Sequence, residues 1–292
     1  MILPLIDLIV LGQDKRKLID YLHENHFIQM LRSCSNGHEL ILMKLSNRSD
    51  ILDGVCLQCP RCNRRKSIRA GSFFENKNLD LLKVLIIFHS FEAKLTASEC
   101  SSLFNLRRRT VSTYYKKIRE MIEADLEAFP IDFAVEGLWE IDETFIGHVL
   151  DTTTNEYVER QWVFGLTNRN TGETFLTLVE DRTQETLLPE ILTHIPPGSV
   201  VFSDELPSYR ILEEFYRHYT VNHGKKEYAR EENIEGFGPT LVHTNNIEGI
   251  WKHFRALLRN KKVRIKKFLH LYTSELMFRM DGRKIFDLIR LF

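Results

Sequence analysis

Residues 138–145 read Leu-Trp-Glu-Ile-Asp-Glu-Thr-Phe, a run typical of a β-strand that carries an aspartate, Asp142, in its interior. Aspartate is depleted from strand interiors, so this residue needs a chemical reason. Two more acids lie in different contexts: Asp204 closes the apolar run 200–204, and Glu248 opens an amphipathic helix. Clustered carboxylates are the ligands of hard divalent cations, and two such ions can activate one oxygen while stabilising another. The three acids therefore predict a site for two Mg²⁺ or Mn²⁺ ions.

The segments around these acids predict an α/β fold. The expected elements are strand 138–145, strand 161–167, strand 173–179, helix 183–194, strand 200–204, short helix 207–215 and strand 219–222. Glycine and proline clusters separate them, the strongest stop being Pro196-Pro197-Gly198. Three antiparallel strands followed by alternating helices and strands is the order of an RNase H-like fold. We therefore expect an RNase H-like catalytic domain over residues 135–260.

Two of the acids have close competitors. Glu143 competes with Asp142, but neighbouring strand residues face opposite sides of a sheet, so only one of them can point to the site. Asp204 could instead be an ordinary turn residue at the end of a strand, and Glu205 is then the alternative ligand.

The helix that begins near Glu248 has two different faces. Its apolar face consists of Ile247, Ile250, Trp251, Phe254, Leu257 and Leu258. A separate polar stripe carries Glu248, Lys252, Arg255 and Arg259, so the acid can reach a metal while the cations contact phosphates. Two structural explanations remain open: Asn245 caps the helix and Glu248 bonds back to it, or Glu248 pairs with Lys252.

The formal net charge of zero conceals a strong segregation. Residues 61–119 carry 14 Lys and Arg against 4 Asp and Glu, residues 120–250 carry 8 against 26, and residues 251–292 carry 12 against 3. Two basic regions around an acidic block favour two polyanion-binding surfaces beside a metal centre, although solvated helix faces would look the same. Length and a hydrophobic content of 43% indicate about two packed domains. We expect neither a membrane span nor a signal peptide.

Three of the five cysteines lie in the run 56–62. Cys59-x₂-Cys62 is a good half of a zinc site, and Cys34 with His38 is its expected partner. Cys56 is a rival ligand, and a set of free thiols is the alternative.

Residues 96–118 predict a helix-turn-helix. Thr96 is the expected cap of the first helix, and Asn105 suits the positive φ of the turn. The second helix opens with donors suited to DNA, namely Arg107, Arg108, Arg109, Thr110 and Ser112. A generic helical hairpin with a basic surface is the alternative. A second basic run, which includes Lys261 and Lys262, could bind DNA or act as a nuclear localisation signal.

These residues resemble the Merlin transposases and their bacterial ISXO2-like relatives. The matching motifs are Cys59-x₂-Cys62, Ser67-Ile68-Arg69-x-Gly71-Ser72-Phe73-Phe74-Glu75, Glu140-Ile141-Asp142-Glu143, Trp162-Val163-Phe164-Gly165, Glu185-Thr186-Leu187-Leu188-Pro189, Val201-x-Ser203-Asp204, Val221-Asn222-His223, His243-Thr244-Asn245-Asn246-Ile247-Glu248 with Trp251, and Glu275-Leu276-Met277-Phe278-Arg279. They cover about residues 31–280 in the right order.

The resemblance implies a cut-and-paste DNA transposase with a DDE integrase-type core and a triad of Asp142, Asp204 and Glu248. It implies that His243 and Arg255 orient the scissile phosphate, with helix capping as the other role for His243. The implied domains are a helical lead-in (1–30), a zinc-ribbon-like module (31–75), a helix-turn-helix domain (79–128), the catalytic domain (135–260) and a basic helical extension (261–292).

The implied partners are double-stranded DNA, both transposon ends and target, and further copies of the chain in a dimer or larger synaptic assembly. The implied location is the nucleus of a eukaryotic host, or the cytoplasm and nucleoid of a bacterial one. The chain departs from the family pattern at Gly37, where a second cysteine is usual, and at Gly249, where a serine is usual. A domesticated DNA-binding protein and an RNase H-like nuclease without strand transfer are the rival functions.

Overall fold

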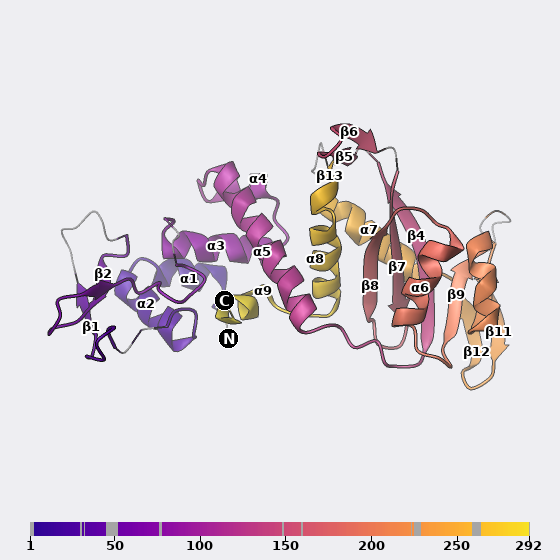
Figure 1. Ribbon diagram of the computed structural model, residues 1–292, viewed down its shortest axis with the longest axis horizontal. Coiled ribbons are helices and arrows are strands. Elements are labelled where there is room, and N and C mark those ends of the chain that lie inside the picture. Colours follow the sequence, from indigo (N-terminus) through magenta and orange to yellow (C-terminus); the bar gives the residue numbers. More distant parts are fainter. Residues whose placement is uncertain are drawn as a thin grey trace. The chain divides into compact units, whose positions relative to one another are not determined.

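The computed structural model of this chain describes residues 3–29, 31, 33–44, 52–75, 78–147, 149–158, 160–222, 224, 229–258 and 264–291. The chain divides into two compact units (Figure 1). Residues 1–118 with 284–292 form the first unit, and residues 119–283 form the second. The five domains expected from the sequence divide the chain differently, since 79–128 and 261–292 each cross a unit boundary, and they stay predictions.

A five-stranded mixed sheet forms the centre of the second unit (Figure 1). Its strands, in the order in which they lie side by side, are β10 (Arg217–Val221), β9 (Val200–Asp204), β4 (Leu138–Ile146), β7 (Gln161–Asn168) and β8 (Thr174–Val179). Strands β4, β7 and β8 pair antiparallel, whereas β9 and β10 run parallel to β4. Along the chain, three antiparallel strands are followed by alternating helices and strands, as predicted from the sequence, and this confirms the RNase H-like fold class.

Helices cover both faces of this sheet, with α6 in front and α7 behind in the view of Figure 1. One face packs against α6 (Gln184–His194) and the 3₁₀ helix η1 (Pro207–Glu214) through a core that includes Trp139, Ile141 and Val201. The other face packs against α7 (Asn245–Leu258) and α8 (His270–Met280). Because both faces are buried, β7 and β9 carry mostly apolar side chains, whereas the middle strand β4 also carries Glu140, Asp142 and Glu143.

Two small sheets in this unit were not predicted from the sequence. The strands β11 (Arg230–Ile234) and β12 (Gly238–Val242) form an antiparallel hairpin. The other sheet contains β13 (Arg264–Ile265), β5 (Val149–Asp151) and β6 (Glu156–Val158), and the short helix η3 (Lys266–Phe268) follows β13. Val242, at the end of β12, packs with Val200 and Phe202 of β9, so the hairpin extends the core beside the chain entry into α7.

The first unit is largely helical. It contains α1 (Leu5–Leu11), α2 (Lys15–Glu24), α3 (Leu81–Glu92), α4 (Ala97–Leu103), the start of α5 (Arg108–Ala128) and α9 (Ile285–Leu291). A three-stranded antiparallel sheet joins them, built from β1 (Ile41–Lys44), β2 (Val55–Gln58) and β3 (Arg65–Lys66). The predicted burial of the helix after Leu79 is confirmed, since eight of the twelve residues of α3 are buried.

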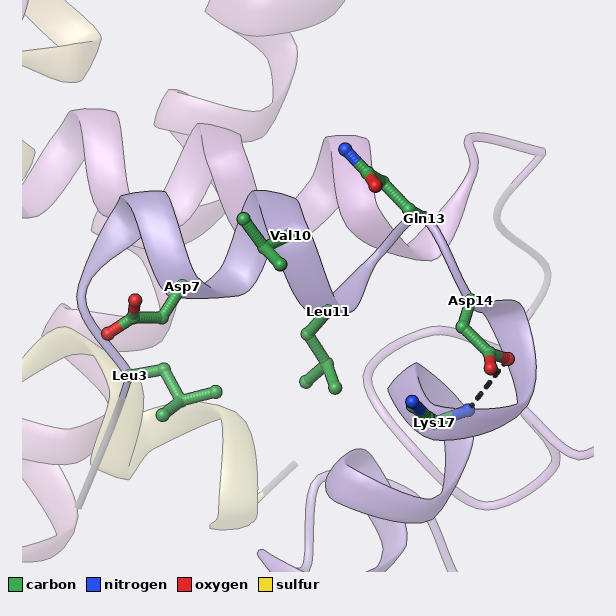
Figure 2. Close-up of a pocket in the computed structure, with 7 residues that line it drawn as sticks. All are labelled: Leu3, Asp7, Val10, Leu11, Gln13, Asp14 and Lys17. Atoms are coloured by element: carbon green, nitrogen blue, oxygen red, sulfur yellow. Dashed lines mark hydrogen bonds between the residues drawn. The ribbon is translucent and has the colours of Figure 1, made fainter.

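Figure 2 shows a pocket beside α1 and α2, lined by Leu3, Asp7, Val10, Leu11, Gln13, Asp14 and Lys17. Asp14 has a structural role in this pocket: its carboxylate accepts the backbone N–H groups of Arg16 and Lys17 and so caps α2. Among the described helices, none has the length and apolar character needed to cross a bilayer.

Candidate active site

Strand β4 places Asp142 on the sheet face that α7 covers. Its even-numbered side chains contact that helix: Glu140 accepts the backbone N–H of Asn246 at 2.8 Å, and Asp142 accepts the indole N–H of Trp251 at 2.8 Å. Its odd-numbered residues Trp139 and Ile141 pack on the opposite face with α6. Since neighbouring strand residues alternate, Asp142 rather than Glu143 shares a face with the helix that carries Glu248.

Asp204 ends β9, the strand that pairs with β4 in parallel. The parallel pairing of β4 with β9 matches Leu138 to Val200 and Glu140 to Phe202, an offset of 62 residues. Asp142 and Asp204 have the same offset and lie two residues beyond the last pair, so both strands carry their acid toward the same end of the sheet. The turn alternative is also present, because Asp204 Oδ1 accepts the backbone N–H of Leu206 at 2.9 Å.

Glu205, the alternative to Asp204, is exposed and hydrogen-bonds to Asn222. One oxygen of Asp204 serves the turn, which leaves the other available to a ligand.

Glu248 lies in the first turn of α7. The alternative in which Asn245 caps this helix does not hold, because the helix begins at Asn245. Thr244 precedes the helix, and its carbonyl accepts the backbone N–H of Glu248 at 3.1 Å. The Thr244 hydroxyl also donates to Glu248 Oε1 at 3.3 Å. The backbone N–H of Asn245 is directed to His243 Nδ1 at 3.2 Å, so His243 does take part in capping α7.

Burial and neighbouring charge raise the pKa of Asp142 to about 6. Desolvation is the first cause, and the charges of Asp204 and Glu248 add to it, whereas the Trp251 N–H acts in the opposite direction. Burial, with Asp142 and Asp204, also raises the pKa of Glu143 to about 8. Asp142 therefore senses the charges of Asp204 and Glu248, and each of the three acids offers hard oxygen donors. Such a half-buried set of carboxylates fits a divalent cation of the Mg²⁺ or Mn²⁺ type.

Trp251 holds α7 against the strand that carries Asp142. The residue opposite Asp142 on β7 is Gly165, and a Cβ there would approach Trp251 to 2.5 Å. Glycine at this position therefore gives the indole its place beside Asp142. One turn further along α7, the exposed Arg255 donates to the Thr144 hydroxyl at 2.5 Å, which places a guanidinium two residues from Asp142.

A second candidate metal site lies in the first unit. The ligand atoms of Cys34, His38, Cys59 and Cys62 all lie within 4.8 Å of one another. His38 Nδ1 is 3.0 Å from Cys62 Sγ and 3.8 Å from Cys59 Sγ. Three sulfurs and one imidazole are a donor set suited to zinc. The rival ligand Cys56 is buried in β2 and does not belong to this group.

The departure at Gly37 is explained by the turn in which it lies. Gly37 has φ +74°, and its N–H donates to the carbonyl of Cys34 at 2.9 Å. The Cys34 N–H donates to the carbonyl of His38 at 2.8 Å. This turn places His38 in the position where it completes the cluster.

A family model of the ISXO2-like transposase domain matches residues 134–281, just over half of the chain. The chain belongs to this transposase family. The matched residues hold all three acids and the helices and strands that position them.

Individual relatives are distant. An uncharacterized transposase-like protein of Haemophilus influenzae is 26% identical over 112 residues, which are 38% of this chain and 83% of that protein. The HTLV-2 integrase catalytic core domain in complex with magnesium is 11% identical, with a TM-score of 0.31 over 53% of this chain and 94% of that one. The simian T-cell lymphotropic virus intasome in complex with PP2A regulatory subunit B56 gamma is 11% identical, with a TM-score of 0.33 over 70% of this chain and 73% of that one.

The two helices predicted over residues 96–118 are present as α4 and α5, an arrangement that fits both a helix-turn-helix and a helical hairpin. Thr96 and Glu99 form a capping box at the start of α4, and Asn105 has φ +50° in the turn. Of the five side chains predicted to bind DNA here, Thr110 is half-buried, and the other four are exposed: Arg107, Arg108, Arg109 and Ser112. Lys252 is exposed on α7, whereas Lys261 and Lys262 lie outside the described residues.

Sequence reasoning missed the group that anchors the start of α7. Glu140 is fully buried and forms an ion pair with Arg169, whose Nε lies 2.6 Å from the Glu140 carboxylate. The sequence held two signals: Glu140 precedes Asp142 by two residues and therefore shares its face, and it belongs to the matching motif 140–143. Nothing in the sequence connected it to Arg169, which lies in the turn after β7.

Proposed function

We propose that this transposase moves a DNA element by cut-and-paste transposition. It would cut at the element's ends by hydrolysis and then join the freed 3′-OH to target DNA. The observation that supports the proposal best is the common face of Asp142, Asp204 and Glu248. The acids come from a strand, a strand end and a helix, and the pKa of Asp142 responds to both of the others.

Asp142, Asp204 and Glu248 are the residues that would hold two Mg²⁺ or Mn²⁺ ions. Bound ions would supply charge stabilisation to the attacking and leaving oxygens. The remaining contribution of the protein is positioning. Arg255 lies beside the acids and is suited to a phosphate oxygen. His243 is occupied with the α7 terminus, which favours its capping role over direct contact with the scissile phosphate.

The partners we propose are double-stranded DNA, as transposon end and as target, and further copies of the chain in a synaptic dimer or larger assembly. The exposed Arg107, Arg108 and Arg109, at and just before the start of α5, would contact the DNA ends. The Cys34–Cys62 group, which consists of Cys34, His38, Cys59 and Cys62, would hold zinc and so stabilise the module that precedes these arginines. For a bacterial host the site of action would be the nucleoid, and for a eukaryotic host the nucleus.

The test uses the purified full chain, Mg²⁺ or Mn²⁺, a duplex carrying the element's own terminal repeat, and a supercoiled plasmid. The Asp204→Ala variant is assayed beside it. We expect joined products that need the metal and disappear in the variant.

Two other outcomes would replace the proposal. Metal-dependent cleavage without joining would identify a nuclease. Tight binding of the repeat with no metal-dependent product would identify a domesticated DNA-binding protein, and the acids would then lack a catalytic role.

A further inference from the structure

Glu140 uses both of its carboxylate oxygens inside the protein. Its Oε2 accepts the backbone N–H groups of Asn246 at 2.8 Å and Ile247 at 3.1 Å, which are two of the unpaired donors at the start of α7. Its Oε1 accepts Arg169 Nε at 2.6 Å and lies 3.2 Å from His243 Nδ1. A strand residue therefore caps a helix that lies more than a hundred residues later in the chain. With both oxygens engaged, Glu140 is not a further metal ligand.

Arg169 connects the same group to the segment that leads into α7. Its guanidinium donates to the carbonyl of Leu241 at 2.6 Å and to the carbonyl of His243 at 2.6 Å. It also lies over the ring of Phe202, 4.0 Å from its centroid. One side chain thus joins β4, β9 and the end of β12 to the first turn of the helix.

We propose that Glu140 and Arg169 are positioning residues that set the place of Glu248 relative to Asp142, a role that rests on the proposed function of the acids. Glu248 follows Asn246 by two residues, so it moves with the turn that Glu140 caps. A slip of one residue along a helix advances it by about 1.5 Å and turns it by about 100°. Either change would move the Glu248 carboxylate out of the common site.

The anchor is separate from the two contacts further along α7. Trp251 and Arg255 fix the helix beside Asp142 and Thr144, but both lie after Glu248. Glu140 supplies the hydrogen bonds from the sheet that lie before it, at Asn246 and Ile247. Loss of Glu140 would therefore free the turn that carries Glu248 while the rest of α7 stays packed.

The experiment compares Glu140→Gln and Arg169→Lys with Glu275→Gln in the full chain. Glu275 is the matched control: it is 2% exposed and pairs with Arg119 at 2.6 Å and Arg279 at 2.9 Å, in the same unit but on α8. Three kinds of measurement are made: hydrogen–deuterium exchange of a peptide spanning 243–251, titration calorimetry for the Mn²⁺ affinity, and steady-state kinetics for the kcat and KM of joining.

In Glu140→Gln we expect exchange in the 243–251 peptide to accelerate and Mn²⁺ affinity to fall about tenfold, the usual effect of losing a residue that orients a metal ligand. We expect kcat to fall by about a hundredfold with KM for DNA unchanged. Arg169→Lys should show the same pattern more weakly, and it decides the matter if Glu140→Gln does not fold. Glu275→Gln should lower the melting temperature without changing Mn²⁺ affinity.

Unchanged exchange or unchanged Mn²⁺ affinity in folded Glu140→Gln would overturn the proposal, as would an equal loss of affinity in Glu275→Gln. The exchange measurement needs no catalysis. If the wild-type chain binds Mn²⁺ without dependence on Asp204, the proposed function fails, whereas accelerated exchange in Glu140→Gln would still establish the cap.

Discussion

The two candidate metal sites of this transposase are assembled in opposite ways. The Cys34–Cys62 group is local: two turns bring four ligand atoms within 4.8 Å of one another. The acid site depends on the tertiary fold, because its ligands come from β4, the end of β9 and the start of α7. Among the described residues, only the cysteine and histidine group is gathered closely enough to hold an ion as it stands.

Charge explains the difference. Backbone N–H groups support the sulfurs, with Asn36 donating to Cys34 Sγ at 3.4 Å and Cys62 donating to Cys59 Sγ at 3.3 Å. The carboxylates instead repel one another, and burial raises the pKa of Asp142 to about 6. We infer that the cysteine and histidine site stabilises its unit once a metal binds. The acid site, in contrast, lowers the stability of its unit while no metal neutralises the carboxylates.

The largest effect is expected from breaking the cysteine site. Structural zinc contributes on the order of 10 kcal/mol to the folding of small modules, so Cys59→Ser or a zinc chelator should unfold much of residues 33–75. Cys56→Ser is the matched control, because Cys56 is buried in the same small sheet but outside the cluster. Native mass spectrometry should find one zinc per chain in wild type and Cys56→Ser, and none in Cys59→Ser. Zinc retained by Cys59→Ser would contradict the assignment.

Breaking the acid site should reduce activity without reducing stability. Asp142→Asn is expected to reduce joining on the order of a thousandfold, because a carboxylate that holds charge at the reacting phosphate is lost. It should not lower the melting temperature in metal-free buffer, since asparagine still accepts the Trp251 N–H and need not be ionised.

The variant Glu143→Gln tests which of the two neighbouring acids, Asp142 or Glu143, the joining reaction requires. Glu143 is on the opposite face of β4, so we expect joining to fall less than about tenfold, within the range of an indirect effect. Joining rates and thermal melts of both variants check this. Loss of activity in Glu143→Gln with activity kept in Asp142→Asn would reverse the assignment of the triad.

Local sequence signals predicted most elements of the second unit. The strand at Leu138, the helix that ends at His194 and the strand that ends at Asp204 were all predicted from apolar runs and turn residues. The capping box at Thr96 was also readable, because its partner Glu99 is only three residues away. These features depend on neighbours in the chain.

The features that sequence reasoning missed depend on distant partners. The sequence offers Asn245 as one candidate cap of α7, because an asparagine precedes the apolar pattern, but Thr244 precedes the helix and a carboxylate from β4 caps it. The β11–β12 hairpin also escaped prediction, since its polar strands show little alternation. A single sequence contains no signal that pairs Glu140 with Arg169 or with the N–H groups of α7.

A medium effect is expected where the fold makes room for the acid site. Gly165→Ala would push a methyl group against Trp251 and Leu176. Overpacking of this kind costs about 3 kcal/mol, and displacement of the indole should also remove its hydrogen bond to Asp142. Denaturant unfolding and joining assays should both show losses. Gly172→Ala is the comparison for glycine in general: its φ of +81° predicts strain, but nothing lies within 4 Å of the added atom, so activity should persist.

The smallest effect is expected from His218 of β10, in contrast to His38, which lies beside the sulfurs of its cluster. His218 Nε2 lies 2.8 Å from the hydroxyl of Ser203, next to Asp204, and burial lowers its pKa to about 4. Between that value and the ordinary 6.5, the unfolded chain takes up a proton more readily than the folded one, so stability is full above about pH 6.5 and falls as the pH drops. From pH 7 to pH 5 wild type should lose about 2 kcal/mol more than His218→Gln. Denaturant unfolding at both pH values tests this, with the exposed His253→Gln as control. Equal losses in wild type and His218→Gln would mean that His218 is not held neutral by the fold.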